Sequence, residues 1–394
     1  MQTGIIVQHG HVPERKSRMV RNDITAIIGV VPAERWPEDH ECGDFIEILL
    51  RREQDIWSHP LRPCFSKPAL RAVRNFFVNG GEVLHLFGVC IEGVEDFRSP
   101  ISLHKIMGAL LDRLRSEEDI AIINVPIAAY LPYEMNRKGD IRCDADALYA
   151  LLLSHCREMN NRFLIMDAPD GLHESLIQRW LRSFREANRD NASYGAIYYP
   201  WLYDGDERFP PGSAMAGVFV RVEREHPPIG IHWPPANIIV QGVTHIEVEL
   251  DWDEAGALAA EHINPLVVQA GRGIVVFGVR TLSMEPAFQF INSRRILNMV
   301  VEQVRRDNLW AVFETNNPHL WHVLDRDIRY RLDNFWDAGM LSMGEKGQKF
   351  AVTCNATNNP PQLRDAGYVN VEIRLQPVGA TEQVVIDLNI GANL

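Results

Sequence analysis

The sequence has no long apolar run, no close cysteine pairing and no concentrated positive charge. None of its apolar stretches approaches the 18 residues that a membrane-spanning helix needs, and the N-terminus has no signal-peptide pattern. The six cysteines are scattered without a Cys-x-x-Cys motif, which predicts reduced thiols in a reducing cytosol. A formal net charge of −12 disfavours binding to nucleic acid or to an anionic membrane, since both need a basic surface.

Signals for catalysis and for metal binding are equally weak. Among fourteen histidines, two pairs are close in sequence, His9 with His11 and His319 with His322, and neither has a third ligand at a recognised spacing. The glycines around Arg272 precede a strand-like run and lack the Lys-Ser/Thr of a phosphate-binding loop. The sequence therefore predicts no enzyme activity, no metal and no cofactor.

What is present is the pattern of an α/β protein. With 394 residues, of which 46% are apolar and 23% charged, the chain can bury a sizeable core and form two domains. Up to residue 188, apolar runs of strand length alternate with amphipathic helical segments, which predicts βαβ units and a partly parallel sheet. The expected strands are 24–31, 83–91, 120–125 and 162–167, and the expected helices are 68–79, 102–115, 144–159 and 172–188.

The second half is more mixed. Apolar runs bounded by Gly or Pro predict further buried strands, and two long helices are expected before the C-terminus. Three final segments alternate apolar and polar residues, as in an antiparallel sheet with one buried face. The expected strands are 218–222, 238–243, 274–279, 350–354, 369–375 and 384–390, and the expected helices are 286–306 and 318–338.

Several motifs follow one another in a characteristic order. They are Tyr199-Pro200-Trp201-Leu202, the Pro210–Val218 segment, Gly230–Asn237, and the strand-like Gly271–Arg280. Together they resemble the C-terminal core of contractile tail sheath proteins, the family of phage tails, contractile bacteriocins and extracellular contractile injection systems. Phe277 and Val279 stand where that family usually has Trp and Ala. The resemblance also implies a strand at 309–316, which matches a strand motif of the family.

The resemblance implies an α/β fold with an α+β core. Residues 1–22 would form an N-terminal arm, residues 23–195 an inserted outer α/β domain, and residues 196–394 the inner sheath core, with a C-terminal strand arm at 381–394. It also implies a non-enzymatic subunit that stacks as six-fold helical rings around an inner tube and contracts to drive the tube through a target envelope. The expected partners are other copies of the chain, the tube protein, and baseplate and terminator proteins, with assembly in the bacterial cytoplasm into a virion tail or a released injection particle.

In this family, strands at both ends of the chain add to a sheet of neighbouring subunits, so the sheet is expected to be antiparallel and shared between subunits. An edge strand offers unpaired backbone groups to such a strand. The alternative is an ordinary hairpin between 369–376 and 384–390 of one chain, and a terminal strand on the chain's own sheet. The predicted donor residues are Ile5, Ile6, Val7, Val384, Ile386, Leu388 and Ile390, and the predicted acceptor residues are Phe350, Val352, Val369, Val371 and Ile373.

The charged face of the helix after Asn317 has two interpretations. Arg326, Arg329 and Asp333 could face an inner tube, or they could belong to a solvated face with weak ion pairs. The function also has alternatives. One is a minor sheath paralogue near a baseplate, and another is an α/β ligand-binding protein or enzyme, which would need a pocket with clustered titratable groups.

Overall fold

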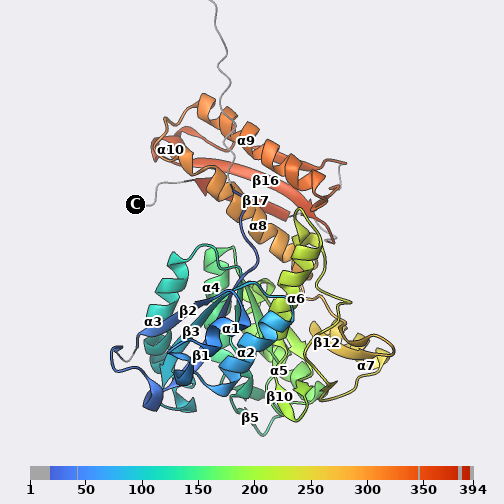
Figure 1. Cartoon of the computed structure of the whole chain (residues 1–394). Coiled ribbons are helices and arrows are strands. Elements are labelled where there is room, and N and C mark those ends of the chain that lie inside the picture. The colour runs from blue at the N-terminus through green and yellow to red at the C-terminus, as the bar shows by residue number, and fades with distance from the viewer. Residues whose placement is uncertain (1–17, 42, 345–346, 380–383, 391–394) are drawn as a thin grey trace, which may run out of the picture.

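The computed structural model describes residues 18–41, 43–344, 347–379 and 384–390, with only the backbone described for the last segment and no side chain described for Val94. Figure 1 shows two lobes. The larger lobe, in blue to yellow, contains a broad sheet with helices around it. The smaller lobe, in orange to red, is formed by the C-terminal part of the chain, and helix α8 lies where the two lobes meet.

The larger lobe is built on an eight-stranded sheet of order β13-β12-β8-β7-β4-β1-β3-β2, counted over the described residues. Its six inner strands pair in parallel, whereas β2 and β13 pair antiparallel at the two edges. The inner strands are nearly continuous apolar runs because both faces of a parallel sheet are covered by helices. The strands are β1 Ile24–Pro32, β2 Phe45–Leu50, β3 Val83–Ile91, β4 Ile122–Asn124, β7 Phe163–Asp167, β8 Gly195–Tyr199, β12 Ile263–Gln269 and β13 Gly273–Val276.

Helices cover both faces of this sheet and divide the core in two. One core contains the apolar faces of α3, α4, α5 and α7, and the other contains those of α1, α2 and α6. The helices are α1 Glu53–Trp57, α2 Lys67–Val78, α3 Pro100–Ser116, α4 Asp146–Met159, α5 Glu174–Ala187, α6 Gly212–Glu225 and α7 Trp252–Ala260. Two small sheets complete the lobe, formed by β5 Tyr133–Met135 with β6 Ile141–Cys143, and by β9 Leu202–Asp204, β10 Glu207–Phe209 and β11 His245–Ile246.

The smaller lobe packs two long helices against an antiparallel sheet. Its central strand β16 pairs with β14 and β15 and with β17, and all pairings are antiparallel. Helix α9 begins after the Asn317 cap, whose side chain accepts from the Leu320 amide at 3.0 Å, and has proline at its first position. The elements are α8 Ile291–Asp307, α9 Pro318–Asp337, β14 Leu341–Ser342, β15 Phe350–Thr353, α10 Pro361–Asp365, β16 Val369–Pro377 and β17 Val384–Ile390.

The predicted mixed α/β fold is confirmed, but three predicted strands are wrong. Residues 218–222 lie within helix α6, residues 238–243 contribute only an isolated bridge from Ile239 to Val275, and residues 309–316 form a 3-10 turn at Leu309–Ala311 followed by a loop. The first eleven residues of α6, Gly212 to Val222, are all buried because the helix lies between α2, the sheet and the second lobe. A short apolar run of this kind cannot be distinguished from a buried strand by periodicity.

The predicted domain boundary at residue 195 does not coincide with a break in the fold. Strand β8 pairs in parallel with β7 on one side and with β12 on the other, so the large sheet continues to Val276. The change between lobes comes after Leu282, before α8 begins at Ile291.

Candidate assembly interface

The predicted acceptor strands form the sheet of the smaller lobe. Val369, Val371 and Ile373 alternate along β16 and are buried, and Val352 of β15 is buried beside them, whereas Phe350 is only partly buried. These side chains belong to a core shared with α8 and α9. Since the side chains are used inside the lobe, what the sheet can offer to another chain is the backbone of its edges.

In the single chain, the C-terminal strand lies on its own sheet. Strand β17 pairs with β16 from Val369↔Ile390 to Leu375↔Val384, which is the hairpin that the sequence left open. A single chain contains no neighbour to receive the strand, so donation by Val384–Ile390 remains a prediction. The N-terminal donors Ile5, Ile6 and Val7 lie outside the described residues.

The three predicted tube-facing charges lie on the exposed side of α9, and each has a partner within the chain. Arg326 pairs with the adjacent Asp327 at 2.8 Å, and Asp333 lies 3.8 Å from Lys349. Arg329 has a more defined position. It makes two hydrogen bonds to Asp325, and its Nη2 donates to the Val352 carbonyl in β15 at 2.5 Å. Whether any of these charges faces a tube remains a prediction.

Helix α8 is buried on its polar side as well as its apolar side, which the sequence did not indicate. Arg294, Arg295, Asn298 and Glu302 are all less than 8% exposed. Asn298 donates to the Arg162 carbonyl of the larger lobe at 2.9 Å, and Arg294 lies over the Tyr194 ring at 4.3 Å. The polar face of α8 therefore forms the contact between the lobes.

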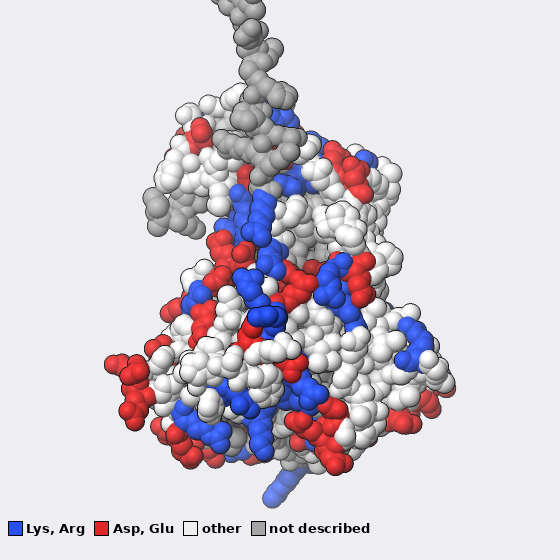
Figure 2. All heavy atoms as spheres, in the orientation of Figure 1, with Lys and Arg blue, Asp and Glu red and all other residues white. Residues whose placement is uncertain are grey.

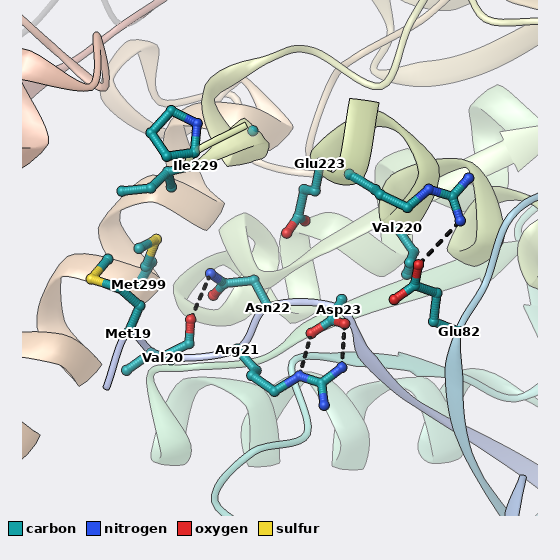
Figure 3. Close-up of a pocket in the computed structure, with 13 residues that line it drawn as sticks. Met19, Val20, Arg21, Asn22, Asp23, Glu82, Val220, Glu223, Ile229 and Met299 are labelled. Atoms are coloured by element: carbon teal, nitrogen blue, oxygen red, sulfur yellow. Dashed lines mark hydrogen bonds and ion pairs between the residues drawn. The ribbon is translucent and has the colours of Figure 1, made fainter. Parts of the chain in front are cut away.

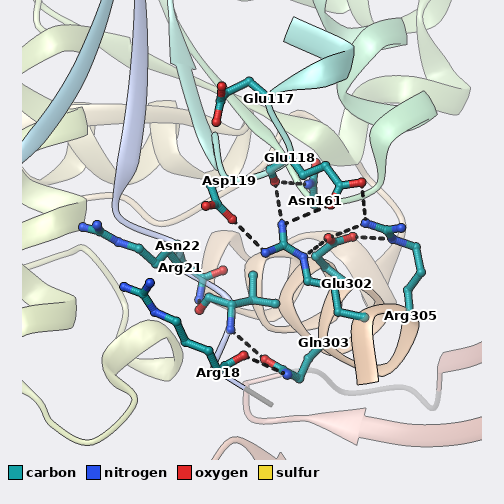
Figure 4. Close-up of polar contacts among 12 residues, drawn as sticks. Arg18, Arg21, Asn22, Glu117, Glu118, Asp119, Asn161, Glu302, Gln303 and Arg305 are labelled. Carbon is teal, nitrogen blue, oxygen red and sulfur yellow. Dashed lines mark hydrogen bonds and ion pairs between the residues drawn. The ribbon is translucent and has the colours of Figure 1, made fainter. Parts of the chain in front are cut away.

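Ion pairs extend this contact at the end of α8 (Figure 4). Arg306 pairs with Asp119 at 2.7 Å, and Arg305 pairs with Glu118 at 3.1 Å. Both arginines also contact the buried carboxylate of Glu302 on their own helix. Glu302 thereby orients the two arginines towards the loop before β4. Glu302, Arg305 and Arg306 of α8 together hold this loop of the larger lobe.

The segment before β1 runs through the same junction. The Val20 amide donates to Gln303 Oε1 of α8 at 2.7 Å, and Arg295 Nη2 donates to the Asn22 carbonyl at 2.9 Å. Figure 3 shows this segment lining a cavity of about 320 Å³, with Met19 near Met299 on one side and Asp23 and Glu82 on the other. The start of the described chain is therefore fixed to both lobes.

The surface offers no concentrated charge on the face seen in Figure 2, where acidic and basic side chains are interspersed over both lobes. Among the described residues, no helix is long and apolar enough to cross a membrane. Within the same residues, no group of three or more His, Cys, Asp or Glu side chains is arranged to hold a metal ion.

One position along the carboxyl edge of the large sheet is filled by protein. Asn124 and Asp167 end the neighbouring parallel strands β4 and β7, at the carboxyl edge of the sheet. The Asp167 carboxylate accepts from the Gly212 amide at the start of α6, and from Asn124 Nδ2 at 3.2 Å. A side chain on Gly212 would collide with Asn124 and Asp167. This contact fixes the start of α6 to the ends of β4 and β7.

Burial raises the pKa of Asp167 to about 7, although the bonds from Asn124 and Gly212 act in the opposite direction. The folded chain thus holds a proton that the unfolded chain has lost between about pH 4 and pH 7. We expect this carboxyl to lower the free energy of unfolding by about 2 kcal/mol as the pH rises from 5.5 to 7.

The measurement is urea unfolding at several pH values for the native chain and for Asp167→Asn. The difference in the free energy of unfolding between the native chain and Asp167→Asn should change between about pH 5.5 and 7 and be constant above about pH 8. Asp170→Asn, a partly exposed carboxyl in the following loop, is the matched control. Parallel pH profiles of the native chain and Asp167→Asn would contradict the prediction.

Comparison with known proteins gives two independent matches to sheath proteins. Residues 283–391 match the family described as the phage tail sheath C-terminal domain, and this range contains the described helices and strands of the smaller lobe. The tail sheath protein of Vibrio phage KVP40 is 28% identical over 243 residues, which cover 57% of this chain. The chain spans about a third of the length of that relative, because the match covers 35% of it.

Solved structures match over the full length. A chain from the anti-feeding prophage baseplate has a TM-score of 0.70 at 18% identity, with 98% of each chain covered. A chain from the sheath complex of an extracellular contractile injection system in its contracted state has a TM-score of 0.69 at 19% identity, covering 100% of this chain and 98% of the other. The resemblance inferred from the motifs is thus confirmed: the chain has the fold of contractile sheath proteins, and its residues 283–391 match the phage tail sheath C-terminal domain family.

Proposed function

We propose that the chain is a structural subunit of a contractile sheath, which polymerises as stacked six-fold rings around an inner tube of another protein. The observation that carries the proposal is the full-length structural match to sheath proteins of contractile injection systems, together with the sheath domain at residues 283–391. In this proposal the subunit has no catalytic role. It is assembled in the bacterial cytoplasm and contacts the tube, a baseplate and a terminator protein.

Strand exchange is the proposed connection between subunits. The sheet of the smaller lobe has antiparallel edges, and β17 follows β16 after a short connection that includes Gly379. A strand that moves from its own β16 to the β16 of a neighbour keeps the same backbone bonds and creates a link between chains. A head-to-tail link that does not close produces a helical polymer, as a sheath requires.

Contraction then requires subunits that move without unfolding. The polar contact along α8 and the anchored segment before β1 support a subunit whose two lobes move together. We take the extended sheath to be a kinetically trapped lattice, and contraction to be rotation of such subunits into a lattice with more buried contact. The strand links would keep neighbours connected while other surfaces change partners.

Deletion of residues 381–394 tests the proposal. We expect the purified full-length chain to form hollow cylinders with six-fold end views by negative-stain electron microscopy. The deletion should abolish them while circular dichroism shows a folded protein, because β17 is the proposed link. Removal of residues 391–394 alone retains β17 and is the control. Long cylinders from the 381–394 deletion would contradict strand exchange, and discrete monomers of the full-length chain would contradict a self-assembling major sheath.

A second candidate is a minor sheath paralogue at a baseplate. It is favoured by the structural match to a chain from a baseplate, whose TM-score is as high as that of the sheath complex. Such a subunit would form one ring or a few rings and would require a template. Single rings in the same micrographs, in place of cylinders, would support this candidate.

A further inference from the structure

Strand β15 forms one edge of the sheet in the smaller lobe. It pairs with β16 through Phe350↔Leu375 to Thr353↔Glu372, and no other strand pairs with it within the described part of the chain. The opposite side of β16 carries β17. An unprotected edge of this kind attracts extended segments of other chains, and proteins commonly place a charged side chain there.

Arg329 occupies this edge. Its guanidinium is held by Asp325, one helical turn earlier, through bonds of 2.8 and 3.1 Å, and its Nη2 donates to the Val352 carbonyl at 2.5 Å. The carbonyls of β15 that point towards β16 are already bonded to β16. A side chain that bonds the Val352 carbonyl from α9 therefore occupies a backbone acceptor that an added strand would need. The arginine is 44% exposed and can swing into solvent.

We propose that Arg329 closes the β15 edge in the free subunit, and that a strand from a second copy of the chain must displace it. The proposal rests on the function proposed above. The strand that fits best is Gly4–Gln8, because β17 already has a place on β16 and this is the other donor predicted from the sequence. Its five residues are enough to pair with the four residues of β15. The nine residues between Gln8 and Arg18 could span at most about 30 Å when extended.

The proposal makes strand addition a competition. Bonds from Arg329 to Asp325 and to Val352 stabilise the free subunit, and the Val352 bond must break before the incoming strand can pair. Removal of the guanidinium should therefore favour addition. A loss of about 1 kcal/mol of competing interaction corresponds to about a fivefold tighter addition of the strand.

The test compares Arg329→Gln with Arg326→Gln. Both substitutions remove one exposed arginine from α9, but Arg326 pairs only with Asp327 among the contacts described and makes none to β15. A fluorescent peptide with the sequence of residues 3–9 is titrated with each full-length protein, and its anisotropy gives the dissociation constant. We expect Arg329→Gln to bind about fivefold more tightly than the native chain and Arg326→Gln to bind like the native chain. Thermal unfolding monitored by circular dichroism establishes that all three are folded.

Equal affinity of the two variants would overturn the proposal and leave the sheath function intact if the native chain still forms cylinders. Absence of peptide binding by every protein would also overturn the proposal. If the chain were in addition monomeric at high concentration, we would conclude that its own N-terminal segment, and not that of a second copy, pairs with β15. A scrambled peptide that binds as well as the native sequence would show non-specific addition and would equally contradict the proposal.

Discussion

Replacement of Arg295 by methionine is expected to lower the free energy of unfolding by about 3–5 kcal/mol. Arg295 is 5% exposed and pairs with Glu223 of α6, donates to the Asn22 carbonyl, and lies over the Phe219 ring. Methionine fills a similar volume but leaves the Glu223 carboxylate buried without its cation. Burial already raises the pKa of Glu223, so without Arg295 this group should be protonated at neutral pH.

Arg305→Met on the same helix is the matched control. Arg305 is 39% exposed and pairs with Glu302 and Glu118, so its loss should cost less than about 1 kcal/mol. Guanidinium chloride unfolding gives both values. Glu223→Gln in the Arg295→Met background should recover part of the loss, because it removes the isolated carboxyl. Equal losses for Arg295→Met and Arg305→Met would show that the Arg295 pair is not the buried connection inferred here.

Gly217→Ala should be the most disruptive single-methyl change that we predict, with a loss of about 3 kcal/mol. Gly217 lies where α6 crosses α2. A Cβ there would fall well inside van der Waals contact of the Phe76 carbonyl and 2.8 Å from Asn79 Cβ. Both neighbours are fixed, since Phe76 is in α2 and Asn79 is fully buried and bonded to Gln241, so the helices would have to separate.

Gly108→Ala provides the opposite expectation. Gly108 lies within α3 with open space around its Cα, and alanine is the better helix former there by up to about 1 kcal/mol. The same chemical change should therefore stabilise at Gly108 and destabilise at Gly217, with thermal unfolding as the measurement. A stabilised Gly217→Ala would contradict the close crossing of α2 and α6.

Most elements up to Asn188 were predictable from the sequence. The helices follow from their amphipathic periodicity and the inner strands from short apolar runs, and α9 follows from the Asn317 cap, Pro318 and an apolar stripe. The alternation in Val369–Pro377 gave both the strand and its buried face. The family resemblance also rested on local motifs, so a distant relationship could be recognised in the absence of any catalytic signal.

Helix α6 and the burial of the polar side of α8 were not predictable in this way. The run at Val218–Val222 has the composition of a strand, yet tertiary packing places it in a helix. The polar side of α8 looks like a solvated face until the other lobe is present to bury it. The role of Arg329 depends on a contact with Val352, 23 residues away, which no spacing rule specifies.

The position of α8 also has a mechanical consequence. Its 17 residues extend about 26 Å along the junction, with side chains engaged with both lobes. A pull on the C-terminal sheet therefore loads the junction in shear, where the contacts along the helix share the force and must fail together. A junction loaded at one end would instead be peeled apart one contact at a time. In the sheath proposed above, such a junction would transmit a load on the strands to the large sheet.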